Sequence, residues 1–279
     1  LPHPFALMSA PSPHHYWLTQ LRTICRAALA LLFDERCPMC GRTLPKSEIC
    51  PSCWFNIPYT HLRGAEGNVL ERLFWSAQMV ERVSAYAWYK PEYDIAKVVH
   101  AFKYHGRKDL AVLMGQAMGR ELMGSRFFEG VEALMPVPLS TQRMRQRGYN
   151  QSECLAEGVS QITGIPLLTT AVARIIDNPS QTTLDPSARR ENVKDIFAVI
   201  DANALVGKHI VVIDDVITVG ATLLSLVHTL RSVPGLRVSL LALCAAGRYH
   251  VGRLSVGELH LPDATTDVQQ HVVRKYHKP

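Results

Sequence analysis

The chain alternates between short apolar runs and longer segments in which apolar residues recur every three or four positions. Short runs bounded by polar residues predict strands, and the recurring pattern predicts amphipathic helices. Strands that alternate with helices predict an α/β fold, with a parallel sheet flanked by helices. The predicted strands are residues 84–89, 131–139, 166–176, 196–200, 211–215 and 237–244, and the predicted helices are residues 18–33, two pieces of 91–121, the segment between Asn150 and Gly164, and residues 224–230.

Length and composition are those of a folded protein with one sizeable core. The chain has 279 residues, of which 47% are hydrophobic, so it can bury an α/β core and still carry a small module, and disorder is excluded as a class. No apolar run approaches the ~20 residues of a transmembrane helix, so no membrane span is expected. The formal charge of +6 and the pI of about 9.0 favour partners that carry phosphate, either nucleotides or nucleic acid.

Two adjacent carboxylates, Asp214 and Asp215, end the apolar run that starts at residue 211 and precede a Thr-x-Gly-x-Thr loop before a helix. In an open parallel sheet, ligands bind beyond the carboxyl ends of the strands, where a helix N-terminus offers N–H groups to an anion. Ionised carboxylates only accept hydrogen bonds, which suits sugar hydroxyls or a hydrated magnesium ion. The pattern predicts a phosphorylated sugar as the ligand. The alternative is a buried strand whose aspartates only cap the helix.

This stretch resembles the phosphoribosyl-pyrophosphate signature of type I phosphoribosyltransferases. The resemblance implies that Asp214 and Asp215 bind the ribose hydroxyls, that magnesium accompanies the ligand, and that five residues wrap the 5′-phosphate: Thr218, Val219, Gly220, Ala221 and Thr222. Val219 departs from the signature, which has a threonine there, and replaces a hydroxyl that faces phosphate with a methyl group. Hydrogen bonds to charged groups contribute roughly 1.5–3 kcal/mol, so affinity is expected to fall by about one to two orders of magnitude.

Four cysteines form two Cys-x-x-Cys pairs: Cys37, Cys40, Cys50 and Cys53. Four thiolates select zinc over other common metals, and a site filled by four protein ligands is structural rather than catalytic. Four unrelated reduced thiols, or a redox pair, are the alternatives. The other three cysteines are scattered through the chain, which fits a reducing, cytoplasmic location better than a disulfide framework.

A basic, aromatic turn that contains Lys103, Tyr104 and Arg107 separates the two predicted helices of residues 91–121. As a hood over the ligand, this turn would bring cations to phosphate and an aromatic ring to a base. A solvated connection between two helices is the alternative.

A second strand–loop–helix unit follows the predicted strand of residues 131–139. Asn150 resembles the N-cap of its helix, directly after Tyr149. A guanidinium group binds two oxygens of a diphosphate at once, in a bidentate manner, so the arginines of the predicted loop fit a diphosphate. Solvated surface arginines are the alternative. The three are Arg143, Arg145 and Arg147.

Residues 177–192 form a long, polar segment that contains prolines, Gln181 and Arg189. Long loops within compact domains are usually functional. By resemblance to phosphoribosyltransferases, this would be the flexible loop that closes over the sugar diphosphate and keeps water out. A simple linker is the alternative.

The order of these motifs resembles the ComF/GntX proteins. The resemblance spans roughly residues 37–244 and rests on the four-cysteine module, Phe-Lys-Tyr-His-Gly-Arg, Pro-Val-Pro-Leu followed by Arg-x-x-x-Arg-Gly-Tyr-Asn-Gln, and the Asp-Asp signature. It implies a cytosolic bacterial protein tied to natural competence or DNA use, with a type I phosphoribosyltransferase fold and a small, zinc-ribbon-like N-terminal module.

Two functions remain open. The first is a phosphoribosyltransferase in which a nitrogen nucleophile displaces pyrophosphate from the sugar, with catalytic roles for Asp214, Asp215, Arg143 and Arg147. The second is a non-catalytic, zinc-containing accessory that kept the fold and binds single-stranded DNA or contacts DNA-uptake machinery. Val219 favours the second function, whereas the two aspartates and the arginines favour at least sugar-phosphate binding.

The expected domain organisation has four parts. Residues 1–17 are predicted to be a disordered extension that lacks the pattern of a secretory signal. Residues 18–62 form a helix and the four-cysteine module, residues 80–250 form the phosphoribosyltransferase-like domain, and residues 251–279 form a peripheral tail.

Overall fold

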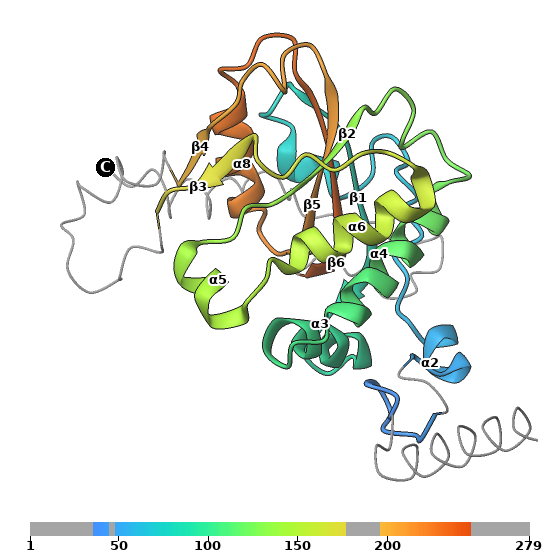
Figure 1. Cartoon of the computed structure of the whole chain (residues 1–279). Helices are drawn as coiled ribbons and strands as arrows, with labels where there is room; N and C mark the ends of the chain where they lie inside the picture. The colour runs from blue at the N-terminus through green and yellow to red at the C-terminus, as the bar shows by residue number, and fades with distance from the viewer. Residues whose placement is uncertain (1–35, 45–47, 177–195, 247–279) are drawn as a thin grey trace, which may run out of the picture. The chain divides into compact units, whose positions relative to one another are not determined.

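The computed structural model describes residues 36–44, 48–176 and 196–246 (Figure 1). They divide into two compact units, one that ends at Asn56 and one that begins at Ile57. Four predicted segments lie outside these ranges: the extension at 1–17, the helix at 18–33, the loop at 177–192 with Gln181 and Arg189, and the tail at 251–279.

A four-stranded parallel sheet forms the centre of the second unit, in the order β1-β6-β5-β2. Its strands are β1 (Val80–Tyr89), β2 (Ala133–Pro136), β5 (His209–Ile217) and β6 (Arg237–Ala246). Every residue of β6 from Val238 to Ala245 is buried, because helices cover both faces of a parallel sheet and its central strands are therefore mostly apolar. The predicted α/β class, with a parallel sheet flanked by helices, is confirmed.

Helices flank this sheet in the positions that the apolar periodicity predicts. They are α3 (Asp94–Tyr104), α4 (Lys108–Leu122), α6 (Gln151–Thr163) and α8 (Ala221–Leu230). Leu226 of α8 and Phe74 of the short 3-10 helix η1 (Glu71–Phe74) share one core with Val212 of β5 and Leu240 of β6. Figure 1 shows α8 and α6 on opposite sides of β5. Among the described residues, no helix combines the length and apolar character needed to cross a bilayer.

Helices α4 and α6 cross with their backbones in close contact. A Cβ added at Gly115 would lie 2.1 Å from the carbonyl oxygen of Leu155, and one added at Gly158 would lie 2.1 Å from that of Val112. These two glycines therefore allow the crossing, which no side chain at either position would permit.

Two predictions differ from the structure in detail. The arginine segment is not a loop but a helix, α5 (Thr141–Arg147), which Ser140 caps by accepting a hydrogen bond from Arg143 N and which ends at Gly148 with φ 74°. The predicted strand at 166–176 is reduced to β3 (Val172–Arg174), which pairs antiparallel with β4 (Phe197–Val199) in a separate two-stranded sheet. Leu167 makes only an isolated parallel bridge to Leu134.

Candidate functional site

The two adjacent aspartates lie near the carboxyl end of the central strand β5. The strand does not end at them, as the sequence predicts, but continues to Ile217. Asp215 is only 6% exposed, and Asp214 is half-buried. Neighbouring β2 runs parallel to β5 and ends at Pro136, so the segment that follows β2 reaches the same edge of the sheet.

Three side chains from other elements donate hydrogen bonds to this carboxylate pair. Lys103 Nζ lies 2.7 Å from Asp215 Oδ1, and Gln151 Nε2 donates to Asp215 Oδ2 at 2.8 Å. Ser152 Oγ donates to Asp214 Oδ1 at 3.2 Å, and the backbone N–H of Asp215 donates to the same oxygen at 2.8 Å. Lys103 comes from the last turn of α3, and the other two residues open α6.

The first turn of α6 is the part of the site that the sequence analysis missed. Gln151 and Ser152 are the first two residues of this helix, and Asn150 caps it by accepting a hydrogen bond from Ser152 N at 3.1 Å. Asn150 also donates through Nδ2 to the carbonyl of Val137 at 3.0 Å, which fixes the helix start to the end of β2. The available signal was topological, because a helix that begins after β2 must start beside the end of β5.

The surroundings of Asp214 change the pKa of its carboxyl group. Burial, and then the charge of Asp215, raise the pKa of Asp214 from 3.8 to about 7, and the hydrogen bonds from Asp215 N and Ser152 only partly oppose this rise. Asp215 has the Lys103 ammonium as a direct partner. Near neutral pH Asp214 therefore exchanges its proton readily.

The loop after β5 is open to solvent at its start and tightly packed at its end. Thr218 is exposed, Val219 is 41% exposed, and Gly220 is buried with φ 73°. A Cβ at Gly220 would lie 3.1 Å from Cζ of Phe74, so both conformation and space require glycine there. Helix α8 begins at Ala221 without a side-chain cap, and its second residue, Thr222, is exposed. Its N-terminal N–H groups suit an anion.

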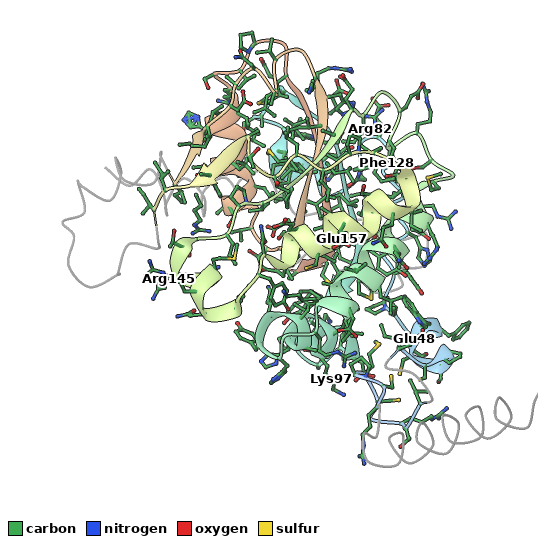
Figure 2. All side chains as sticks on the ribbon, viewed as in Figure 1. Glu48, Arg82, Lys97, Phe128, Arg145 and Glu157 are labelled. Atoms are coloured by element: carbon green, nitrogen blue, oxygen red, sulfur yellow. The ribbon has the colours of Figure 1, made fainter. Side chains whose placement is uncertain are left out.

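A cavity of about 420 Å³ lies between the turn after α3 and helix α5. Its lining is cationic and polar, and consists of Lys103, Tyr104, Gly106, Arg143, Gln146 and Arg147. The structure thus brings together Lys103, Tyr104, Arg143 and Arg147, which the sequence selects separately. Arg145 is exposed on the outer side of α5 and does not line the cavity (Figure 2).

Two buried polar atoms close to this region lack hydrogen-bond partners. Arg147 Nη1 and Gln151 Oε1 make no hydrogen bond to any residue that the structure describes. One is a cationic donor on the helix that lines the cavity, and the other is an acceptor on the side chain that contacts Asp215. Buried polar groups are normally satisfied, so an unpaired donor and an unpaired acceptor are what a ligand with phosphate and hydroxyl groups would complete.

The remaining residues of the predicted hood have internal partners. Arg107 forms an ion pair with Asp109, with 2.6 Å between Nη2 and Oδ2. Tyr149 is buried, donates its hydroxyl hydrogen to the carbonyl of Phe102, and has the Lys108 ammonium 4.9 Å from its ring centroid. Tyr149 thereby connects the end of α3 to the start of α6.

The Tyr104 ring is 63% exposed and is already in contact with two other residues. Arg147 Cζ lies 5.5 Å from its ring centroid, and the His100 ring lies 4.5 Å from it. A base that stacked on this ring would have to share it with those side chains.

The four predicted metal ligands come together in the first unit. The Sγ atoms of Cys37, Cys40, Cys50 and Cys53 all lie within 4.8 Å of one another, and those of Cys40 and Cys50 are 3.7 Å apart. A tetrahedral metal with bonds of about 2.3 Å to sulfur requires sulfur atoms about 3.8 Å apart, so the cluster could hold a metal ion. Gly41, with φ 75°, closes the first turn by donating its N–H to the carbonyl of Cys37.

Three known proteins from different bacteria are similar to this chain over most of its length. DNA utilization protein YhgH of Escherichia coli is 27% identical over 225 residues, which cover 79% of this chain and 95% of that protein. Competence protein F of Haemophilus influenzae is 26% identical over 214 residues, 75% of this chain and 90% of that protein. Competence protein ComFC of Bacillus subtilis is 25% identical over 201 residues, 71% and 72% of the two chains. These similarities support a relationship to the ComF proteins.

They are consistent with the family that the motif order predicts. No protein-family model matches the chain. Two solved structures match part of it: the allosteric regulatory enzyme of purine biosynthesis (TM-score 0.36, 20% identity) and the glutamine phosphoribosylpyrophosphate amidotransferase from B. subtilis (TM-score 0.35, 21% identity). Each match covers 51% of this chain and under a third of the other chain, 29% and 30% respectively.

The architecture that the sequence predicts is confirmed in both units. The α/β unit is a parallel sheet flanked by helices, with the loop of residues 218–220 between the central strand β5 and α8. The other unit holds the predicted cluster of four cysteines.

Proposed function

We propose that this chain binds phosphoribosyl pyrophosphate, or a closely related sugar phosphate, together with magnesium. The observation that carries the proposal is a pair of unsatisfied buried atoms: Arg147 Nη1, on a residue that lines the cavity with Lys103, and Gln151 Oε1, on the side chain that donates to Asp215. Hydroxyls of a sugar supply the donors that Gln151 Oε1 and the carboxylates accept, and phosphate supplies the acceptor for Arg147.

Each part of the ligand then has a place on one edge of the sheet. The 5′-phosphate lies at residues 218–222, against the N–H groups that open α8. The ribose hydroxyls face Asp214 and Asp215, and the diphosphate enters the cavity lined by Lys103, Arg143 and Arg147. Magnesium would neutralise phosphate charge next to the carboxylates, whose oxygens are the ligands that this ion prefers.

The same arrangement supports transfer of the phosphoribosyl group. A nitrogen nucleophile would displace pyrophosphate at C1, so the developing negative charge would fall on a group that three cationic side chains surround. Positioning and electrostatic stabilisation supply most of the rate enhancement in reactions of this type, and no covalent nucleophile from the protein is required. We propose this pentosyl transfer as the activity of the site. The four-cysteine cluster is proposed to hold one structural zinc ion.

Calorimetric titration with phosphoribosyl pyrophosphate and magnesium tests the binding proposal. We expect saturable binding to the unaltered protein and its loss in Asp214→Asn/Asp215→Asn, because the amides carry no charge and accept fewer hydrogen bonds. Asp94→Asn, at the exposed start of α3, is the matched control and should bind as the unaltered protein does. No heat at millimolar ligand would contradict the proposal.

A second candidate function is binding of single-stranded DNA. It is supported by the cationic residues on and around α5 and by the names of the relatives, which refer to DNA utilization and to competence. Phosphate contacts release counterions, so log affinity for an oligonucleotide should fall steeply with log salt, and Arg143→Ala/Arg147→Ala should flatten that slope by about two. Arg237→Ala, at the first residue of β6, is the control. A slope near zero in the unaltered protein would contradict DNA binding.

A further inference from the structure

Lys103 contacts a carboxylate and also lines the cationic cavity. Its ammonium lies 2.7 Å from Asp215 Oδ1, where the two side chains are only 20% and 8% exposed. The same side chain lines the cavity with Arg143 and Arg147. It is therefore the one residue that belongs both to the carboxylate pair and to the cationic cavity among the residues described for these two features.

In this state Lys103 competes with a sugar for Asp215. Lys103 holds one oxygen of this carboxylate and Gln151 Nε2 holds the other at 2.8 Å. A ribose hydroxyl that donates to Asp215 must share this buried carboxylate with the ammonium, whose charge-assisted bond is the stronger of the two. A sugar that offers nothing in return to the ammonium would leave a poorly solvated lysine without its counter-ion.

A diphosphate in the cavity would provide a new counter-ion for the Lys103 ammonium. Its oxygens would share the cavity with Lys103, Arg143 and Arg147 Nη1, which is buried and unpaired among the described residues. A lysine ammonium on a flexible four-carbon stem donates up to three hydrogen bonds, so it can turn from the carboxylate to phosphate without movement of α3. The ammonium thus gains a new counter-ion as it releases Asp215 to the sugar.

We propose that Lys103 is a specificity-determining residue that makes sugar binding at Asp215 conditional on a diphosphate in the adjacent cavity. This inference rests on the proposed function and adds a selectivity to it. The chain selects a sugar that carries both a 5′-phosphate and a diphosphate at C1, and it rejects ribose 5-phosphate, which cannot provide the anion that withdraws Lys103.

The test compares the affinities of two ligands, phosphoribosyl pyrophosphate and ribose 5-phosphate, with magnesium present throughout. Lys103→Gln removes the charge but keeps an N–H donor for Asp215, which protects the fold. We expect it to bind phosphoribosyl pyrophosphate about 10- to 100-fold more weakly, the range for a lost hydrogen bond to a charged group. Ribose 5-phosphate should bind about tenfold more tightly, because its hydroxyls no longer compete with an ammonium.

Lys97→Gln is the matched control, because Lys97 lies on the same helix but is exposed and paired with Asp94 at the surface (Figure 2). It should keep both affinities. Lys103→Met is the second variant, and thermal melts establish that each protein is folded before titration. Where ribose 5-phosphate binds too weakly for direct titration, its affinity is measured by displacement of bound phosphoribosyl pyrophosphate.

The outcomes separate this inference from the function on which it rests. No binding of phosphoribosyl pyrophosphate to the unaltered protein overturns the proposed function. Binding to the unaltered protein, with both ligands weakened equally in Lys103→Gln or with no gain for ribose 5-phosphate, overturns the role of Lys103 alone. Weaker binding of phosphoribosyl pyrophosphate together with tighter binding of ribose 5-phosphate in Lys103→Gln supports the role of Lys103. Loss of a merely structural lysine would not change the two affinities in opposite directions.

Discussion

Asp214 and Asp215 are adjacent in the sequence but have different electrostatic environments. Asp215 has an ammonium partner, whereas Asp214 accepts hydrogen bonds from a hydroxyl and a backbone N–H and has a second carboxylate beside it. Burial, and then the charge of Asp215, raise the pKa of Asp214 to about 7. Asp214 is therefore a group whose charge changes near neutral pH.

The raised pKa of Asp214 predicts a specific dependence of stability on pH. The folded chain holds this proton up to about pH 7, whereas the unfolded chain releases it near 3.8, so the folded chain binds more protons in between and stability falls as pH rises across that window. Asp214→Asn removes this contribution. Relative to the unaltered protein, the variant should gain about 1–3 kcal/mol between pH 5 and pH 8, allowing for partial solvent screening.

Urea unfolding of the two proteins at both pH values measures this difference. A stability difference that does not change between pH 5 and pH 8 would contradict the raised pKa. The midpoint shifts are compared at constant ionic strength, because screening changes every charged pair at the surface.

Val219 is the residue at which the loop after β5 departs from the phosphoribosyl-pyrophosphate signature that it resembles. Its side chain is 41% exposed, so a hydroxyl placed there would face solvent or a ligand rather than the core. Val219→Thr should strengthen binding of phosphoribosyl pyrophosphate about 10- to 100-fold by adding a hydrogen bond to phosphate. Val206→Thr, at a valine of similar exposure (48%) before β5, is the control in the same titration. Equal effects of the two variants would show that residue 219 does not face the phosphate.

At the scale of elements, the position of α6 determines the site. Its first turn supplies Gln151 and Ser152 to the two carboxylates, and its middle packs against α4 through Gly115 and Gly158. The helix is therefore held at its start by the cap at Asn150 and along its length by a contact that tolerates no side chain. A change in the crossing of the two helices displaces the donors to Asp214 and Asp215.

Gly158→Ala should separate α4 from α6. Its Cβ would lie 2.1 Å from Val112 O and 2.7 Å from Gln116 N, both backbone atoms that cannot rotate away. We expect a loss of about 1–3 kcal/mol in the free energy of unfolding, as for other overpacked cores, together with weaker sugar-phosphate binding. Gly124→Ala is the control, because no atom lies within 4 Å of its added Cβ. Urea melts with equal midpoints for the two variants would contradict this account of the crossing.

Local signals predicted most elements, and the errors arose where the structure depends on contacts between distant segments. Apolar runs and helical periodicity located β1, β5, β6, α3, α4, α6 and α8. Helix α5 was predicted as a loop because it has no buried residue and hence no apolar stripe, although Ser140 and Gly148 are ordinary helix-boundary residues. The antiparallel pairing of β3 with β4 could not be predicted from either segment alone.

The candidate site was predicted in its residue types and incompletely in its contacts. Asp214, Asp215, Lys103 and the arginines follow from charge and spacing, because each lies in a motif of its own. The bonds of Gln151 and Ser152 to the aspartates were not predicted, because a neutral side chain in the first turn of a helix carries no signal of what it faces. Only the order of strands in the sheet places that turn beside β5.

At the scale of the whole molecule, the two units differ in what stabilises them. The second unit has an extensive apolar core centred on β5 and β6, whereas the first places its four cysteine sulfurs within 4.8 Å of one another. Small modules with few apolar residues commonly depend on a metal for folding. The cluster is therefore expected to be essential to the first unit.

Metal analysis after exhaustive dialysis should find about one zinc ion per chain, the stoichiometry of a four-thiolate site. Cys37→Ser/Cys50→Ser should lose it, because a hydroxyl is a poor replacement for a thiolate ligand. Cys154→Ser, at a half-buried cysteine of α6 outside the cluster, should retain it. Absence of zinc from fully reduced, unaltered protein would contradict the assignment.

The strand order also constrains how this protein is made on the ribosome. Strand β1 pairs with β6, where Val80 lies opposite Val238, and β6 separates β1 from β5. During synthesis β1 therefore lacks its partner strand in the parallel sheet until nearly the whole described chain has emerged. Until then β5 also has one unpaired edge. The sheet whose edge carries Asp214 and Asp215 is therefore complete only after β6 has inserted between β1 and β5. Long-range parallel pairing of this kind folds slowly, which leaves the nascent chain exposed to aggregation and to chaperones for longer than a locally paired fold.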